Sequence, residues 1–251
     1  MAPTTNVLIT GCSRGIGKSL LTTYLSRPDH VIIGTVRDVN PSLSASLDAL
    51  PKGHNTRLVL LKLDSASTTD ASALVETIKS TFRIGHLDIV IANAGISNYF
   101  GSARVTPPAE MLSHYTVNTL GPLLLFQATA SLLDLGSNPR FVAISSGAGS
   151  ISGMDNLKVE NTAYGASKCA LNFVTRKIHM ENEGIIAFPI NPGWLRTDLG
   201  NHAAAEAGME QAPVPVEDGI RGVVDRIDKA TREMTSGRFM SGQDTDTFLG
   251  W

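Results

Sequence analysis

The chain begins with a strand, a glycine-rich loop and a helix in direct succession, and this order limits its possible folds most. Residues 6–10 form a short apolar run that predicts a buried strand. Residues 11–17 then have the spacing G-x-x-x-G-x-G, and residues 18–26 have a helical pattern. Amides at a helix N-terminus bind phosphate, and glycines let phosphate approach the backbone closely. The beginning of the chain therefore predicts a nucleotide-binding site.

Strand and helix patterns alternate through the rest of the sequence. Apolar runs that end in turns predict six more strands, at residues 31–36, 57–63, 87–92, 140–146, 184–190 and 237–242. Apolar residues at helical spacing predict helices at residues 67–82, 109–135, 162–183 and 216–231, with a short surface helix within 39–56. This alternation predicts a Rossmann-like α/β fold, with a doubly wound, mostly parallel seven-stranded sheet and helices on both faces. We find no linker or repeat and expect one domain over residues 1–251.

Composition excludes several classes of protein. A net charge of -2 without basic clusters gives no reason to expect a nucleic-acid or membrane partner. The run at residues 120–133 is too short and too polar to span a bilayer, and the N-terminus shows no signal-peptide pattern. Cys12 and Cys169 are the only cysteines, so we expect a reducing, cytoplasmic location. No two of the six histidines lie four residues apart, and we predict no metal site.

Tyr164 and Lys168 stand four residues apart in a predicted helix, so they share one helix face. An ammonium near a phenol stabilises the phenolate, and we therefore expect Lys168 to lower the pKa of Tyr164. A phenol with a pKa brought toward neutrality can act as a general acid or base. Taken alone, the pair is also compatible with an ordinary surface helix.

The end of the second predicted strand bears on the type of nucleotide. In a dinucleotide fold this position faces the adenosine ribose, where a cation accommodates a 2′-phosphate and a carboxylate binds the free hydroxyl. Arg37 follows the strand, and Arg14 in the glycine loop supplies a second guanidinium. Asp38 comes one residue later, so both cofactors stay possible. We favour NADP(H) over NAD(H).

Polar residues at other strand and helix positions are candidates for the same site. Ser145 and Ser146 end the fifth predicted strand, where open parallel sheets bind their ligands. Asn118 lies in the middle of an apolar helical stretch, and its amide is either bonded structurally or part of a site. Residues 93–95, Asn-Ala-Gly, follow the fourth predicted strand and allow a ligand to lie against the backbone.

These motifs, in this order, resemble the short-chain dehydrogenase/reductase family in its single-domain branch, over nearly the whole chain. The resemblance implies a catalytic group that maps onto Asn118, Ser146, Tyr164 and Lys168. Tyr164 would donate a proton to a carbonyl oxygen, Lys168 would bind the nicotinamide ribose, Ser146 would hold the carbonyl and Asn118 would hold a relay water. Ser146 is preferred to Ser145 by family analogy alone. Eighteen residues (164 minus 146) separate Ser146 from Tyr164, about five more than is usual in the family.

The resemblance also implies which residues hold the cofactor and the substrate. The expected cofactor-binding residues are Gly11, Ser13, Arg14, Gly15, Ile16, Gly17, Arg37, Asp64, Asn93, Ala94, Gly95, Tyr164, Lys168, Pro192, Gly193, Leu195 and Thr197. The expected substrate contacts are Ser97, Tyr99, Phe100, Ser146, Tyr164, Trp194 and residues 199–209, in a region around 194–215. Residues 201–215 are rich in Ala, Gly and Pro, and we expect them to be mobile.

Within the family, residues 10–17 and 191–200 look most like carbonyl reductases grouped with C-factor, sniffer and fungal norsolorinic acid ketoreductase. This implies reduction of a ketone, possible substrates being aromatic or polyketide-like compounds. An alternative is an NADP(H)-binding sensor that turns over slowly, and another is epimerisation or dehydration on the same scaffold. Family members usually form dimers or tetramers, so we expect a homo-oligomer.

Overall fold

The computed structural model describes residues 4–157, 159–244 and 248–251, and its strands form one parallel seven-stranded sheet. The strand order is β3-β2-β1-β4-β5-β6-β7, and every pairing between named strands is parallel. The strands are β1 (Thr5–Ile9), β2 (His30–Val36), β3 (Arg57–Lys62), β4 (Ile89–Ala92), β5 (Arg140–Ile144), β6 (Ile186–Asn191) and β7 (Met240–Ser241). The predicted fold class is confirmed.

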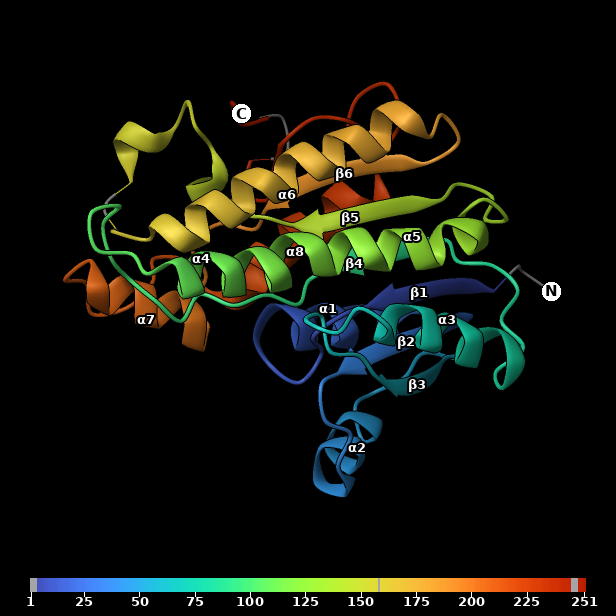
Figure 1. Ribbon diagram of the computed structural model, residues 1–251. Helices are drawn as coiled ribbons and strands as arrows, with labels where there is room; N and C mark the ends of the chain where they lie inside the picture. The colour runs from blue at the N-terminus through green and yellow to red at the C-terminus, as the bar shows by residue number, and fades with distance from the viewer. Residues whose placement is uncertain (1–3, 158, 245–247) are drawn as a thin grey trace.

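Helices cover both faces of this sheet (Figure 1). They are α1 (Gly15–Leu25), α2 (Pro41–Asp48), α3 (Asp70–Ser80), α4 (Pro108–Tyr115), α5 (Gly121–Leu133), α6 (Thr162–Glu181), α7 (Asp198–Glu206) and α8 (Val216–Asp228). Among the residues described, no helix is both long enough and apolar enough to cross a membrane.

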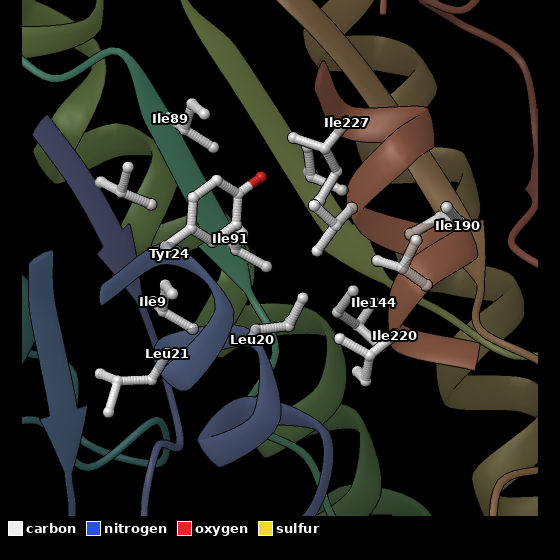
Figure 2. Packing of buried hydrophobic residues seen from close by; sticks show 14 of the residues in the cluster. Ile9, Leu20, Leu21, Tyr24, Ile89, Ile91, Ile144, Ile190, Ile220 and Ile227 are labelled. Atoms are coloured by element: carbon white, nitrogen blue, oxygen red, sulfur yellow. The ribbon is translucent and has the colours of Figure 1, made fainter. Parts of the chain in front are cut away.

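Alternate side chains of each strand enter separate cores, because successive strand residues point to opposite faces. Val7 and Ile9 of β1 belong to the core under α1 and α8, whereas Leu8 belongs to the core under α3, α5 and α6. Figure 2 shows the first of these cores, where Leu20 and Tyr24 of α1 lie near isoleucines of the sheet and of α8. Both sheet faces are thus buried, which explains the continuous apolar runs in the sequence.

The strand order indicates at which point of the sheet a ligand would bind. The first three strands run from β1 outward to β3, and the chain then returns to place β4 on the other side of β1. In open parallel sheets, ligands bind outside the carboxyl ends of the strands at such a switch point. The glycine loop follows β1 and the Asn-Ala-Gly segment follows β4, so both motifs lie at this point.

The long helix expected over residues 109–135 is interrupted. A π-helical turn, Thr116–Leu120, separates α4 from α5, and Asn118 lies at its centre. Pro122 stands in the first turn of α5, where a missing amide hydrogen costs little. Single π-turns within α-helices are frequent at functional sites.

A helix also stands within residues 201–215, where we expected a mobile stretch. Alanines favour helix, and the Thr197 side chain caps the N-terminus of α7 by accepting a hydrogen bond from the Gly200 amide at 3.0 Å. The Asn201 side chain then accepts from the Ala212 amide at 3.0 Å and holds the following segment back onto the helix. The composition of this stretch was misleading because Gly208, Pro213 and Pro215 all lie after the helix.

Candidate active site

A cleft of about 930 Å³ lies at the carboxyl ends of the strands. That volume is within the range of small-molecule and cofactor sites. Of the residues expected individually from the sequence, all line it except Tyr99, Phe100 and Asn118. Of the expected stretch 199–209, only Leu199, Gly200, Ala203 and Met209 line it. The cleft therefore joins segments from both ends of the chain into one site.

The glycine loop forms one end of the cleft, and close packing explains its glycines. A Cβ atom on Gly17 would lie 2.2 Å from the Gly11 carbonyl oxygen and 2.5 Å from Asn93 Nδ2. Gly11 and Gly15 have φ angles of +73° and +55°, in the left-handed region that glycine adopts without strain. The loop therefore turns tightly before α1 and leaves its backbone open to phosphate.

Hydrogen bonds join the glycine loop to the Asn-Ala-Gly segment after β4. The Thr10 hydroxyl accepts from the amides of Asn93 and Ala94, both at 3.0 Å. The Asn93 side chain donates to the Thr10 carbonyl at 2.8 Å. Thr10 was not singled out from the sequence, where it reads as the last residue of a strand. Asn93 thus fixes the two turns that form the floor of the cleft.

Two arginines, in different surroundings, line the part of the cleft where the sequence led us to expect the adenosine. Arg37 follows β2, is exposed, and makes no hydrogen bond or ion pair within the described residues. Arg14 is ion-paired with Asp198 at the start of α7, at 2.9 Å, with both side chains about three-quarters exposed. Such an exposed pair contributes little to stability. Of these two guanidiniums, Arg37 is therefore the one that can bind an anion without first breaking an ion pair.

Tyr164 and Lys168 lie at the centre of the cleft, as their spacing on α6 predicted. The Tyr164 hydroxyl faces the Ser146 side chain, and the Ser146 hydroxyl opposes the rise in the Tyr164 pKa that burial causes. Lys168 Nζ lies 5.8 Å from the Tyr164 ring centroid and donates to the Ile144 carbonyl at 2.8 Å. The Ile144 carbonyl at the end of β5 therefore holds the Lys168 side chain. Ser146, two residues later, lies beside Tyr164.

Burial controls the proton equilibria of this pair. It lowers the pKa of Lys168 to about 8, because a buried ammonium loses hydration. It raises the pKa of Tyr164 by disfavouring the phenolate, and the Ser146 hydroxyl opposes this only in part. Our expectation that Lys168 lowers the pKa of Tyr164 is therefore not met in the protein alone, because Lys168 is not among the causes of the shift and burial dominates it. A phenol that keeps its proton is suited to donate it.

The side chains of Ser145 and Ser146, which follow β5, make different contacts. The Ser145 hydroxyl donates to Asn172 Oδ1 at 2.6 Å in the buried interior, and Asn172 in turn donates to the Gly149 carbonyl. The Ser146 hydroxyl accepts from the Ala148 amide at 3.2 Å and faces Tyr164. The geometry therefore favours Ser146 for chemistry and gives Ser145 a packing role.

Asn118 lies behind the wall of the cleft and is fully buried. Its Oδ1 accepts from the Ile96 amide at 2.8 Å, and its Nδ2 donates to the Ile96 carbonyl and to Ser167 Oγ, each at 2.9 Å. With these bonds its amide links the segment after β4 to α6. The side chain is therefore committed to protein partners, and the expected role of Asn118 in holding a relay water stays a prediction.

The substrate end of the cleft is lined by some expected residues and by others that the sequence did not indicate. Ser97 and Trp194 line it, whereas the Tyr99 hydroxyl donates to the Val105 carbonyl at 3.1 Å and the Phe100 ring packs against His202 of α7. The lining residues that we missed include Asn98, Ser113, Val117, Asn156, Leu157 and Val159, whereas Pro213 lies in the expected region. Ser113 and Val117 are four residues apart in the predicted helix and therefore share one of its faces. This spacing was the one feature of the sequence that could have indicated them.

Comparison with known proteins identifies the family. The family model described as short chain dehydrogenase matches residues 5–208. This chain belongs to the short-chain dehydrogenase family, as its fold and its motifs indicated. The expected enzyme class, an oxidoreductase of this family, is confirmed as well.

Individual relatives agree with this assignment. Norsolorinic acid ketoreductase of Aspergillus parasiticus is 40% identical over 239 residues, which cover 94% of this chain and 88% of the relative. The NADPH-bound carbonyl reductase from chicken fatty liver has a TM-score of 0.86 at 26% identity, covering 99% of this chain and all of the other. Carbonyl reductase Sniffer of D. melanogaster has a TM-score of 0.83 at 27% identity, with the same coverage. The resemblance to ketone-reducing members is therefore confirmed.

Proposed function

We propose that this protein reduces a ketone to a secondary alcohol with NADPH. The observation that carries the proposal is that Ser146 and Tyr164 line the same cleft as Lys168 and the glycine loop, with the Tyr164 hydroxyl facing the Ser146 side chain. The family and its ketone-reducing relatives support it. Consumption of NADPH by the purified protein with a ketone, and isolation of the alcohol, is the direct test.

The residues at the centre of the cleft have different roles in the reaction. A bound nicotinamide supplies the hydride. Ser146 and Tyr164 hold the carbonyl oxygen through their hydroxyls and stabilise the negative charge that develops on it. Tyr164 then donates its proton to that oxygen, for which its raised pKa keeps it protonated.

Lys168 supports the reaction through its ammonium group, which lies near the Tyr164 ring. Its ammonium is held by the Ile144 carbonyl, and a Cβ on Gly95 would come within 3.5 Å of it, so it stands between β5 and the segment after β4. There it is placed to donate to a ribose hydroxyl and to favour a phenolate once Tyr164 has given up its proton. We assign it both roles.

The residues at the adenosine end fit a phosphorylated dinucleotide. The backbone packs too closely at Gly17 for a side chain, and Arg37 at the end of β2 has a guanidinium without a partner among the described residues. A guanidinium binds phosphate through two parallel hydrogen bonds, whereas a free ribose hydroxyl gains little from it. We therefore assign NADP(H) as the cofactor and Arg37 as the main contact to the 2′-phosphate.

Removal of this guanidinium should change the preference between cofactors. We expect Arg37→Ala to raise the Kd for NADPH roughly ten- to hundredfold, because a charge-assisted hydrogen-bond pair is lost, and to leave the Kd for NADH nearly unchanged. Titration of nicotinamide fluorescence measures both constants. Arg57→Ala is the matched control, since Arg57 is an exposed arginine at the opposite, amino end of β3. Equal effects on both cofactors would refute the assignment.

The lining of the cleft indicates the chemistry of the ketone. The charged side chains among the lining residues are Arg14, Arg37, Asp64, Lys168 and Asp198. All of them belong to the cofactor end or the catalytic centre. Around the substrate end the lining residues that the structure describes are instead neutral and partly apolar, with Val117, Leu157 and Trp194 among them. We propose an uncharged aromatic or polyketide-like ketone, in line with the norsolorinic acid ketoreductase at 40% identity.

We further propose that the protein forms a homodimer or homotetramer through α4 and α6. These two helices pack against each other and lie together at one surface of the molecule (Figure 1). They carry Leu112, Tyr115 and Phe173, whose exposed fractions of 67%, 42% and 70% are high for large apolar residues. Light scattering should give at least twice the mass of the chain, and Phe173→Glu should shift it to the monomer. A monomeric wild-type protein would refute this proposal.

A further inference from the structure

The loop between β5 and α6 is the segment that carries the extra length noted in the sequence. Its two ends line the cleft, through Gly147 and Ala148 at the start and Asn156, Leu157 and Val159 at the end. Its middle does not line the cleft and is poorly covered, since Ile151 and Met154 are 64% and 54% exposed. The position of the lining residues therefore depends on what holds the middle of the loop.

Two residues from the far end of the sequence hold it. Ser150 Oγ donates to the Gly250 carbonyl at 2.7 Å, and the Ser152 amide donates to the backbone oxygen of Trp251 at 2.8 Å. All other hydrogen bonds that the described structure gives to residues 150–157 stay within this loop. Figure 1 shows the end of the chain, marked C, beside the loop that precedes α6.

Trp251 is itself anchored to the body of the protein. Its ring stacks on Phe239, with ring centroids 6.1 Å apart and planes 24° apart. The guanidinium of Arg176, on α6, lies 5.3 Å from the same ring. Arg176 also donates to the Gly237 carbonyl, so it does not depend on Trp251 for its place. The indole therefore connects the loop to the helix that carries Tyr164 and Lys168.

We propose that Trp251 is a positioning residue for the ketone: its ring anchors a backbone link that fixes the loop against the substrate end of the cleft. Trp251 does not line the cleft, so it acts through Ser150 and Ser152. The inference rests on the proposed ketone reduction. It assigns a part of substrate recognition to a residue remote from the reacting atoms.

Steady-state kinetics tests the proposal with Trp251→Ala, Trp251→Phe and the control Leu135→Ala, which removes a 68% exposed apolar side chain after α5. Trp251→Ala should raise the KM for the ketone about tenfold, since the loop loses two modest hydrogen bonds. It should leave the NADPH Kd within about twofold of wild type. Trp251→Phe should restore most of the KM, because a phenyl ring can stack on Phe239. A fall in kcat with an unchanged KM would overturn the proposal.

A double mutant separates positioning from a loss of stability. Ser150→Ala removes the link from the loop side, and Ser150 and Trp251 should then show strongly non-additive effects on KM, because both act on one connection. Additive effects on KM would overturn the proposal. Leu135→Ala combined with Trp251→Ala should be additive.

Amide hydrogen exchange tests the link without any turnover. In Trp251→Ala, peptides from residues 150–157 should exchange faster than in wild type, while peptides from α6 keep their protection. Unchanged exchange in the loop would overturn the link itself, and faster exchange with an unchanged KM would overturn its role for the ketone. If the wild-type protein reduces no ketone, the proposed function fails, and the exchange experiment still decides whether Trp251 holds the loop.

Discussion

Tyr164→Phe should lower kcat for ketone reduction roughly 1,000-fold, because it removes the proton donor and leaves the aromatic ring in place. The phenol faces Ser146 in the cleft, and burial raises its pKa, so it is protonated at neutral pH. No other phenol lines the cleft among the described residues. Pre-steady-state measurement of NADPH oxidation gives the rate of the chemical step directly.

The same variant should bind NADPH almost as wild type does. The glycine loop and Arg37 lie at the other end of the cleft, and Lys168 keeps its hydrogen bond to the Ile144 carbonyl. Tyr115→Phe serves as the control, because its side chain is 42% exposed on α4 and does not line the cleft. Turnover by Tyr164→Phe at a rate near that of wild type would show that another group donates the proton.

Ser146→Ala and Ser145→Ala should have opposite effects, although the two serines are neighbours. Ser146→Ala should lower kcat roughly 100-fold or more, because the developing oxyanion loses one of its hydroxyl donors. Its stability should hardly change, since its hydroxyl faces the cleft. Ser145→Ala should lower the free energy of unfolding by about 1–3 kcal/mol, because Asn172 Oδ1 loses a buried hydrogen-bond donor.

Thermal unfolding and steady-state kinetics on both variants separate the two roles. We expect a lower Tm with near-normal kcat for Ser145→Ala at a temperature where it is folded, and the reverse for Ser146→Ala. If Ser145→Ala loses kcat and Ser146→Ala keeps it, the catalytic serine has been misassigned.

The fold was predictable because the burial of strands and helices determines where apolar residues occur in the sequence. Both faces of the sheet are covered, so its strands read as continuous apolar runs, and the helices of α/β units show apolar residues at helical spacing. Local exceptions were not predictable in the same way. The π-turn around Asn118 keeps a helical pattern, and α7 is followed by the glycine and the two prolines that suggested a loop.

The site was predictable where a residue's role depends on its place in a motif. Tyr164 and Lys168 share a helix face because of their spacing, and Gly11 and Gly17 stand where the loop allows no side chain. Roles that depend on contacts distant in sequence were not predictable. The bonds of Asn118 to Ile96, the pairing of Arg14 with Asp198 and the link from Ser152 to Trp251 join separate segments. Without the fold, nothing in the local pattern relates these residues.

Loss of nicotinamide absorbance, followed with NADPH and separately with NADH, tests the central claim most directly. The purified protein is mixed with a panel of uncharged aryl, quinone and polyketide-like ketones, and Tyr164→Phe is run beside it as the blank. Our account predicts oxidation of NADPH with at least one class of ketone, much slower oxidation of NADH, and formation of the secondary alcohol. Tight binding of NADPH with no oxidation by any ketone would contradict it and would favour a protein that senses the cofactor instead.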